Sequence, residues 1–361
     1  MNARSNSCLP HSRPSVGTDE IQAVEAVLKG NYVGYGEIAQ KLESVFCIRT
    51  GKRFGFAVAS GFHALSLGIR ALDLPKCSLV SLPVLTCPSL IDAVEGAGHR
   101  PGLGDISRED LTLEASSLSA GTQAIIAPHA YGAPLDIDAI EQLGLPWIED
   151  CATSPATYAK ARPAGSWGTL AVFSFNSTKY ITAGTGGMLL TNDPDLADKI
   201  HGLLDSDSSS QVGAWQNGRP SGFPGRLSDV NAAIALEQFK KMPSFLQRRR
   251  SIAAIYSQEL CDVPGLSVPA NIAGHSYYRY IVRTRDSSGN IAALLQSKGI
   301  DARSAVNPWL DALVGHESAR GSLRNAGYWR AHLLSLPINA SMTDEEAYYV
   351  ADNLSKLLRP S

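Results

Sequence analysis

The sequence predicts an α/β protein with a mostly parallel, twisted central sheet that helices cover on both faces, followed by a smaller C-terminal domain. Two observations support this fold class. Short apolar runs alternate with amphipathic helical patterns through the first two thirds of the chain, as strand–helix–strand units require. The chain also has 361 residues, 44% of them hydrophobic, which is enough for two domains, each with its own core.

The expected elements follow in order from the N-terminus. We expect residues 1–12 to form a mobile tail and residues 18–28 to form an amphipathic helix that Gly30 closes. The later apolar runs predict strands at 54–58, 78–82, 124–127, 147–148, 170–175 and 187–191. Helical spacing between them predicts helices at 64–72, 89–95 and 137–143. A polar stretch rich in serine, glycine and proline predicts a long surface loop at 205–224.

The pattern changes after this loop. Ser228 can cap a helix that we expect to stop near Pro243, and a second helical run opens at Arg248. We therefore divide the chain into a large domain, residues 1–245, and a small C-terminal domain, residues 246–361. The small domain is expected to hold a strand at 277–282 and a last helix that begins at Thr343.

Composition excludes several classes of protein. The 32 Lys and Arg residues against 34 Asp and Glu residues give a formal net charge of −2, which does not suit an obligate nucleic-acid binder. No apolar run is long enough to span a membrane, and no export signal is visible at the start. The six cysteines and eight histidines are scattered without metal-ligand spacing. We expect a cytoplasmic protein with reduced thiols that binds no metal, nucleic acid or membrane.

Two residues carry the main chemical signal. Asp150 ends the apolar run Trp147-Ile148-Glu149, and ligands of open α/β sheets sit beyond the carboxyl ends of strands. Lys179 follows the next apolar run, 170–175, in a setting of small and apolar residues that would favour a nucleophilic amine. The alternatives are a helix-capping carboxylate and an ordinary surface lysine.

Pyridoxal phosphate chemistry requires both of these groups. The lysine holds the cofactor as a Schiff base, and the carboxylate keeps the pyridine nitrogen protonated so that the ring accepts electrons. A phosphate site is the third requirement. The turn Ser60-Gly61-Phe62 lies between a predicted strand and a predicted helix, so that backbone N–H groups and the helix dipole point to one place.

From Arg13-Pro14 onward, the chain resembles the DegT/StrS family of pyridoxal-phosphate sugar aminotransferases, which have the three-layer, fold-type-I architecture of aspartate aminotransferase. The segments that carry the resemblance share its order and wording; they are Gly30-Asn31-Tyr32-Val33-Gly34-Tyr35-Gly36, Ala59-Ser60-Gly61, Tyr131-Gly132-Ala133-Pro134, Ile148-Glu149-Asp150, Phe173-Ser174-Phe175 with Thr178-Lys179, Gly184 with Gly186-Gly187-Met188, Arg226-Leu227-Ser228-Asp229 and Leu334-Ser335-Leu336-Pro337.

The resemblance implies roles for individual residues. Lys179 would be the Schiff-base lysine and Asp150 the partner of the pyridinium nitrogen. Ser174 and the Ser60-Gly61 turn would bind the phosphate, and Arg226 belongs to the segment that reaches the phosphate of the neighbouring subunit. The resemblance also implies a homodimer with active sites at the subunit interface.

The chain departs from the family pattern at five positions around the cofactor. Cys87 stands where an aromatic residue usually lies on the ring, and Thr153 replaces a Gln or His. The other three are Phe62 after Ser-Gly, Asn176 before the lysine and Pro224 near Arg226. These departures favour an altered cofactor pocket, of which Phe62, Cys87, Thr153 and Asn176 remain expected members.

The leading functional hypothesis is an aminotransferase that moves an amino group from glutamate to a keto-sugar or a nucleotide-linked keto-sugar. We expect Tyr32, Asn307 and Trp309 to contact the substrate, with core packing as the alternative for Trp309. One rival is a pyridoxal-phosphate enzyme of another reaction type, such as a dehydratase, although dehydratase relatives carry histidine in place of Lys179. The other is a non-catalytic homologue that acts as a binding or regulatory partner.

Overall fold

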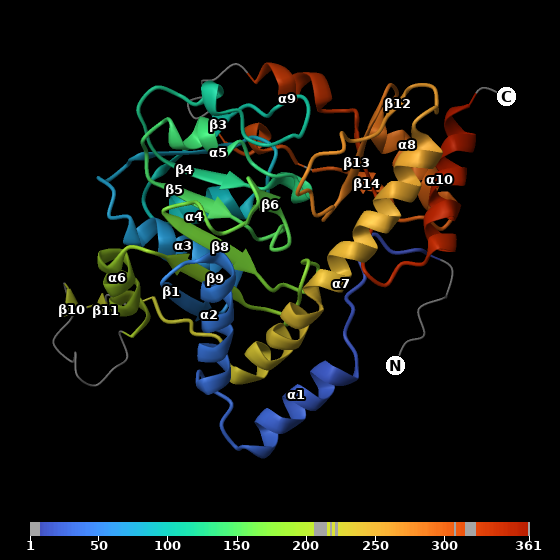
Figure 1. The fold of residues 1–361 in the computed structure, drawn as a ribbon. Coiled ribbons are helices and arrows are strands. Elements are labelled where there is room, and N and C mark those ends of the chain that lie inside the picture. The colour runs from blue at the N-terminus through green and yellow to red at the C-terminus, as the bar shows by residue number, and fades with distance from the viewer. Residues whose placement is uncertain are drawn as a thin grey trace.

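A computed structural model describes residues 8–205, 215–216, 219–220, 223–306, 308–314 and 323–359. Its centre is a seven-stranded sheet with the order β1-β9-β8-β5-β4-β2-β3, in which only β9 runs against its neighbours (Figure 1). This confirms the mostly parallel sheet. The strands are β1 (Phe54–Val58), β2 (Leu79–Pro83), β3 (Arg100–Gly104), β4 (Thr122–Pro128), β5 (Trp147–Asp150), β8 (Leu170–Ser174) and β9 (Gly187–Thr191).

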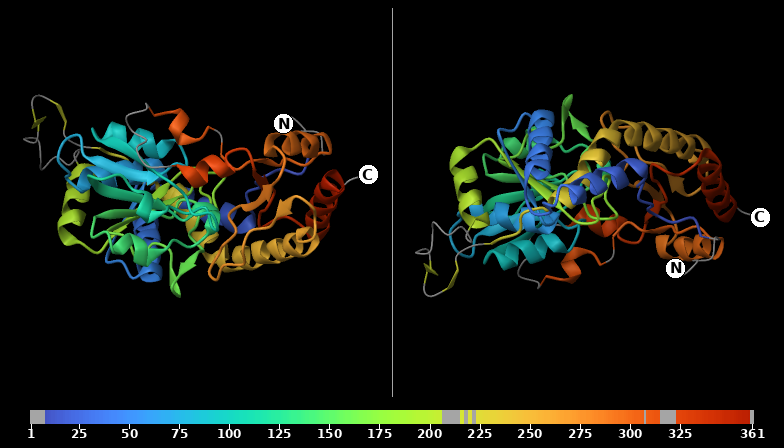
Figure 2. Two further views of the ribbon diagram at one scale, coloured as in Figure 1. Left: turned by 90° about the horizontal axis from the view of Figure 1, so that it is seen from above. Right: turned by 90° about the horizontal axis from the view of Figure 1, so that it is seen from below.

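Helices cover both faces of this sheet and make it the middle of three layers (Figure 2). Side chains of a strand alternate between the faces. Ile148 therefore packs with the helices of one face, and Trp147 packs with the opposite face. The first face carries α3 (Gly61–Ala71), α4 (Ser89–Gly96) and α6 (Pro194–Leu204). The second carries α2 (Glu37–Thr50), α5 (Ile137–Glu141) and the first half of α7 (Asp229–Leu260).

The small domain is built on a four-stranded antiparallel sheet with the order β12-β13-β15-β14. Its strands are β12 (Leu266–Ser267), β13 (Tyr280–Thr284), β14 (Arg303–Ser304) and β15 (Leu333–Leu336). The second half of α7 packs on this sheet with α8 (Ser288–Ser297) and α10 (Asp344–Leu358), around a separate apolar core. No helix in the described part of the chain is both long and apolar enough to cross a membrane.

The remaining elements are short or peripheral. Most residues of the predicted loop at 205–224 lie outside the described part of the chain. Among those that are described, β10 pairs with β11. The β6–β7 hairpin follows Asp150 along the chain. The bounds of these elements are α1 (Thr18–Lys29), η1 (Ala115–Ser117), η2 (Ala130–Gly132), β6 (Tyr158–Ala159), β7 (Arg162–Pro163), β10 (Trp215–Gln216), β11 (Arg219–Pro220), η4 (Leu310–Ala312) and α9 (Arg324–Trp329).

The predicted helix stop at Pro243 is wrong. Helix α7 continues through this proline for 32 residues and joins the large domain to the small one (Figure 1). A proline removes one backbone hydrogen bond and crowds the preceding turn. Burial on both sides compensates, because Leu236 and Phe245 belong to the core of the large domain, whereas Ile252 and Tyr256 belong to that of the small domain.

The prediction of a mobile tail over residues 1–12 is wrong for the part that the structure describes, which begins at residue 8. Leu9 forms a parallel bridge with Ile300. His11 is only 3% exposed, and its Nε2 atom lies 2.9 Å from Ser335 Oγ. Arg13 continues the docking through an ion pair with Glu346. The segment therefore packs on the small domain before the chain enters α1.

This docking predicts a pH dependence of stability. Burial, followed by the charges of Arg279 and Arg303, lowers the pKa of His11 from 6.5 to about 3. Between these two values the unfolded chain binds a proton that the folded chain does not bind, so stability rises with pH. The contribution of His11 is complete above pH 6.5, and we expect roughly 2 kcal/mol of it to be lost at pH 5.

Urea unfolding of the wild type and His11→Gln at pH 5 and pH 8 measures this contribution. The difference in free energy of unfolding between the two pH values should be smaller in the variant by about 2 kcal/mol. His275, whose pKa burial also lowers to about 3, is present in both proteins and cancels in the comparison. Equal differences in the two proteins would contradict the assignment.

Candidate active site

One cavity of about 890 Å³ lies beyond the carboxyl ends of the parallel strands, between the large domain and the small domain. Ligand sites of open α/β sheets occupy this position because loops from several strands converge there. Nine of the residues singled out in the sequence line this cavity; they are Ser60, Gly61, Phe62, Cys87, Asp150, Thr153, Ser174, Asn176 and Lys179. Residues from four separate segments therefore meet at one place.

Asp150 is the last residue of β5 and is 7% exposed. Burial raises the pKa of its carboxyl, and the N–H of Ala152 and the charge of Lys179 offset part of this effect. The Ala152 N–H donates to Oδ1 over 2.9 Å. Among the described residues no other group donates to this carboxylate, so that Oδ2 can accept a proton-bearing ligand nitrogen.

Lys179 lies in the turn after β8, and its side chain is half-buried on the same cavity. The backbone N–H of Lys179 donates to the carbonyl of Asn176 over 2.9 Å, and Asn176 Oδ1 accepts the backbone N–H of Thr178 over 3.3 Å. The phenol of Tyr278 donates to the carbonyl of Thr178 over 3.2 Å. The turn is thus held from both sides, and no carboxylate of the described residues forms an ion pair with the Lys179 amine.

The third group is the N-terminus of α3. Ser60 caps this helix by accepting the N–H of His63 over 3.0 Å. The N–H groups of Gly61 and Phe62 have no hydrogen-bond partner among the described residues, as the first turn of a helix leaves them free. A Cβ atom at Gly61 would lie 2.6 Å from Ser174 Cβ, so only glycine lets the Ser174 hydroxyl approach this turn.

These groups fit pyridoxal phosphate. A buried carboxylate with an available oxygen suits the ring nitrogen, a lysine amine suits the aldehyde, and a helix N-terminus beside a serine hydroxyl suits the phosphate. Four of the five positions that depart from the family pattern also line this cavity; Pro224 does not. Cys87 is exposed to it, with Ser89 Oγ 3.1 Å from the thiol, and Thr153 Oγ1 donates to the carbonyl of His129 over 3.4 Å.

Three predicted site residues in the described part of the chain do not line this cavity. Arg226 pairs with Asp205 of its own chain through two hydrogen bonds. Tyr32 is 59% exposed and lines a different groove between α1, α2 and α7. Trp309 is 6% exposed and packs in the core of the large domain, and Asn307 lies outside the described residues.

The sequence did not single out five further residues that line the cavity. They come from the small domain and the N-terminal segment, with Tyr131 from the large domain; they are His11, Tyr131, Tyr278, Arg279 and Arg303. Tyr131-Gly132 was noted only as part of the family resemblance, and Tyr277-Tyr278 as core packing. No local pattern connects His11 with Arg279, because 268 positions separate them.

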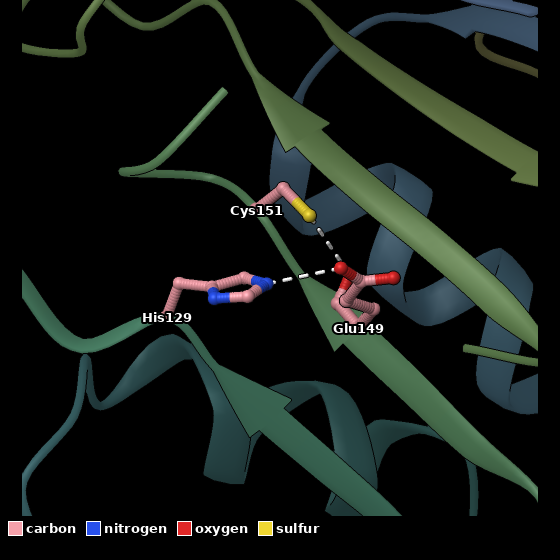
Figure 3. A group of neighbouring side chains, drawn as sticks. All are labelled: His129, Glu149 and Cys151. Carbon is pink, nitrogen blue, oxygen red and sulfur yellow. Dashed lines mark hydrogen bonds and ion pairs between the residues drawn. The ribbon is translucent and has the colours of Figure 1, made fainter. Parts of the chain in front are cut away.

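A buried cluster of His129, Glu149 and Cys151 lies at the end of β5 (Figure 3). Glu149 faces away from Asp150, because successive side chains of a strand alternate between its two sides. The three side chains could hold a metal by composition, but protein groups already use their ligand atoms. His129 Nδ1 accepts the N–H of Leu135 over 3.2 Å, and its Nε2 atom contacts Glu149 Oε1 at 2.9 Å. The Cys151 thiol donates to the Glu149 carbonyl, and burial raises its pKa.

Glu149 holds the loop that follows β7. Its carboxylate accepts the N–H groups of Gly165, Trp167 and Gly168 over 2.7, 2.8 and 3.0 Å. Burial alone would raise the pKa of Glu149, but the bonds from His129 and from this loop hold it below the usual value. We interpret the cluster as a structural support that sets the position of β5, and hence of Asp150.

Comparison with known proteins agrees with this geometry. The model of the DegT/DnrJ/EryC1/StrS aminotransferase family matches residues 14–355. The fold and the site together define a fold-type-I, pyridoxal-phosphate-dependent aminotransferase. The chain belongs to the DegT/DnrJ/EryC1/StrS aminotransferase family.

Several solved structures superpose on the chain over almost its full length. The aminotransferase TlmJ from Streptoalloteichus hindustanus is 28% identical, with a TM-score of 0.86 over 97% of this chain and 98% of TlmJ. DesV from S. venezuelae is 25% identical, with a TM-score of 0.85 over 95% of each chain. PseC from Helicobacter pylori, an aminotransferase of pseudoaminic acid biosynthesis, is 20% identical, with a TM-score of 0.88 over 97% and 99%.

The structural role of Glu149 leads to a stability prediction. In Glu149→Gln the side-chain amide would bring N–H donors against the backbone N–H groups that the carboxylate now accepts. We expect a loss of about 3 kcal/mol or more in the free energy of unfolding. Chemical unfolding measures this loss, with Glu141→Gln on the exposed face of α5 as a control that changes stability by less than about 0.5 kcal/mol. Equal stability of the two variants would refute the role.

Proposed function

We propose that this aminotransferase moves an amino group from an amino-acid donor, glutamate, to the ketone of a sugar or nucleotide-linked sugar. The single observation that supports this reaction is the meeting of Lys179 and Asp150 on one cavity beside the helix N-terminus of α3. Each group alone has an ordinary structural explanation. Their meeting, together with membership of the family, favours the catalytic interpretation.

Pyridoxal phosphate, when bound, supplies the aldehyde that links to amines and a ring that accepts electrons. The residues of the chain bind the cofactor and move the protons. Asp150 Oδ2 accepts the hydrogen bond of the ring nitrogen and keeps that proton in place. The Lys179 amine would hold the cofactor at rest. Once the donor amine has displaced it, Lys179 would take the proton from the donor α-carbon as a general base and give it back as a general acid. Ser174 and the N–H groups of Gly61 and Phe62 bind the phosphate.

The rest of the cavity suits a sugar. Beyond the cofactor groups, hydroxyl and amide side chains face it from both domains, and sugar hydroxyls need such partners when they leave water. The volume of about 890 Å³ is large enough for a cofactor and a substrate together. The polar side chains that line this part are Thr178, Thr185, Gln296, Ser304 and Ser335.

We also propose that the enzyme is a cytoplasmic homodimer. The six cysteines are all thiols, as a reducing compartment keeps them.

A groove of about 650 Å³ between α1, α2 and α7 is lined by apolar side chains such as Val27, Leu236 and Phe239, and Tyr32 lies at its edge. A second copy of the chain would cover it. Sedimentation equilibrium should give twice the chain mass of 38.4 kDa. A single-chain mass at micromolar concentration would contradict the dimer.

The role of Lys179 can be tested by spectroscopy. The wild type with added pyridoxal phosphate should show a visible absorption band, and borohydride should then fix the cofactor to the peptide that contains Lys179. Glutamate added before borohydride should bleach the band. Lys179→Ala should lose the covalent attachment and reduce the rate of amino transfer by about 1,000-fold or more. Lys199→Ala, an exposed lysine on α6, is the matched control and should behave as the wild type.

Asp150→Asn separates cofactor binding from catalysis in the same experiment. The variant keeps the shape of the side chain but loses the negative charge that holds the ring nitrogen protonated. It should still bind the cofactor, whereas the rate of bleaching by glutamate should fall by about 100-fold. A wild-type protein that takes up no cofactor, or full activity in Lys179→Ala, would overturn the proposed function.

A further inference from the structure

Besides Lys179, two arginine side chains line the active-site cavity in the described part of the chain, namely Arg279 and Arg303. Arg303 is neutralised, because its Nε and Nη2 atoms bind Asp301 over 2.8 and 2.6 Å. Arg279 is different. Its Nη1 atom contacts the His11 imidazole and donates to Ser12 Oγ over 3.2 Å, and both of these partners are neutral. No carboxylate of the described residues pairs with it.

Arg279 is held close to the lysine turn. Its guanidinium lies 4.8 Å from the ring centroid of Tyr278. The phenol of Tyr278 donates to the carbonyl of Thr178, the residue before Lys179. One tyrosine ring therefore separates the guanidinium from the turn that carries the amine. His11 fixes the other side of the guanidinium, because a neutral imidazole nitrogen accepts an N–H from arginine.

Tyr131 adds a second donor on the same part of the cavity. Its carbonyl accepts the backbone N–H of Arg279 over 3.1 Å, which places the two residues side by side. Its phenolic oxygen is buried and has no hydrogen-bond partner among the described residues. Its φ of 54° is in the left-handed region, which a tyrosine rarely adopts and which persists only where the surrounding structure enforces it.

A cation without a carboxylate partner and a buried phenol without an acceptor together suit an anionic ligand with hydrogen-bond-accepting oxygens. An amino-acid donor must bring a carboxylate into this cavity. Asp150 is the one acidic side chain among the described lining residues, and it would repel that carboxylate, so the carboxylate needs a cationic partner away from Asp150. A guanidinium matches a carboxylate with two parallel N–H···O bonds.

We propose that Arg279, with the phenol of Tyr131 beside it, binds a carboxylate of the amino donor and orients the donor amine toward Lys179. This inference rests on the proposed function, because only an amino-transfer reaction brings an amino acid to this place. With Arg279 in this role, the small domain and the N-terminal segment that holds Arg279 recognise the donor. The large domain holds the cofactor.

Calorimetric titration of the cofactor-loaded enzyme with glutarate tests the proposal. Glutarate has both carboxylates of glutamate but no amine, so it binds without reacting. Arg279→Leu should weaken glutarate binding by about 10- to 100-fold. Arg279→Lys, which keeps the charge but not the planar fork, should give an intermediate loss, and Tyr131→Phe a loss of about 3- to 10-fold. Arg285→Leu removes an exposed arginine of the same domain and should bind as the wild type.

Unchanged glutarate binding in Arg279→Leu that retains the cofactor absorption band would overturn the proposal. A second titration with inorganic phosphate distinguishes the carboxylate from a phosphate of the acceptor. If Arg279→Leu weakens phosphate binding and leaves glutarate binding intact, the site belongs to the acceptor and the proposal is wrong. Failure of the proposed function looks different, since the wild type would then bind glutarate but glutamate would not bleach its absorption band.

Discussion

The position of two adjacent carboxylates at the end of β5 is the constraint on which the site depends. Alternation along the strand sends Glu149 to one face and Asp150 to the other. Glu149 is saturated by His129 and by three backbone N–H groups, and its rigid environment fixes the strand end. Asp150 can therefore stay buried with a free oxygen toward the cavity, at the energetic cost that its raised pKa reflects.

The N-terminus of α3, which is the expected anion site, lies near Asp150 because the backbones of the turn after β1, the start of β9 and the end of β8 approach one another closely. Strand β9 lies between β1 and β8, so that the turn after β1 is joined to the end of β8 through the first residues of β9. A Cβ atom at Gly187 would lie 2.4 Å from the carbonyl oxygen of Ser60, and one at Gly61 would collide with Ser174. The two glycines let the N-terminus of α3 and the Ser174 hydroxyl share one place, which is what a phosphate needs.

The cavity is complete only because two domains face it. Helix α7 runs through both, and the N-terminal segment docks on the small domain before the chain enters α1 and the large domain (Figure 1). The large domain carries the lysine, the buried acid and the anion site. The small domain adds most of the polar and cationic groups opposite them, so any movement between the domains would change the distance between Lys179 and Arg279.

The sequence by itself determined the α/β fold, most strands of the sheet and the two groups of the proposed chemistry, because strand ends and glycine turns are local patterns. It did not determine edge strand β3, in which Arg100-Pro101-Gly102 has little strand propensity. Nor did it determine the passage of α7 through Pro243, where burial outweighs a lost hydrogen bond. Only the tertiary structure decided that His11, Tyr131 and Arg279 meet on the cavity that Lys179 also lines. Their contacts join residues far apart in the chain, and no periodicity of a single segment records such a meeting.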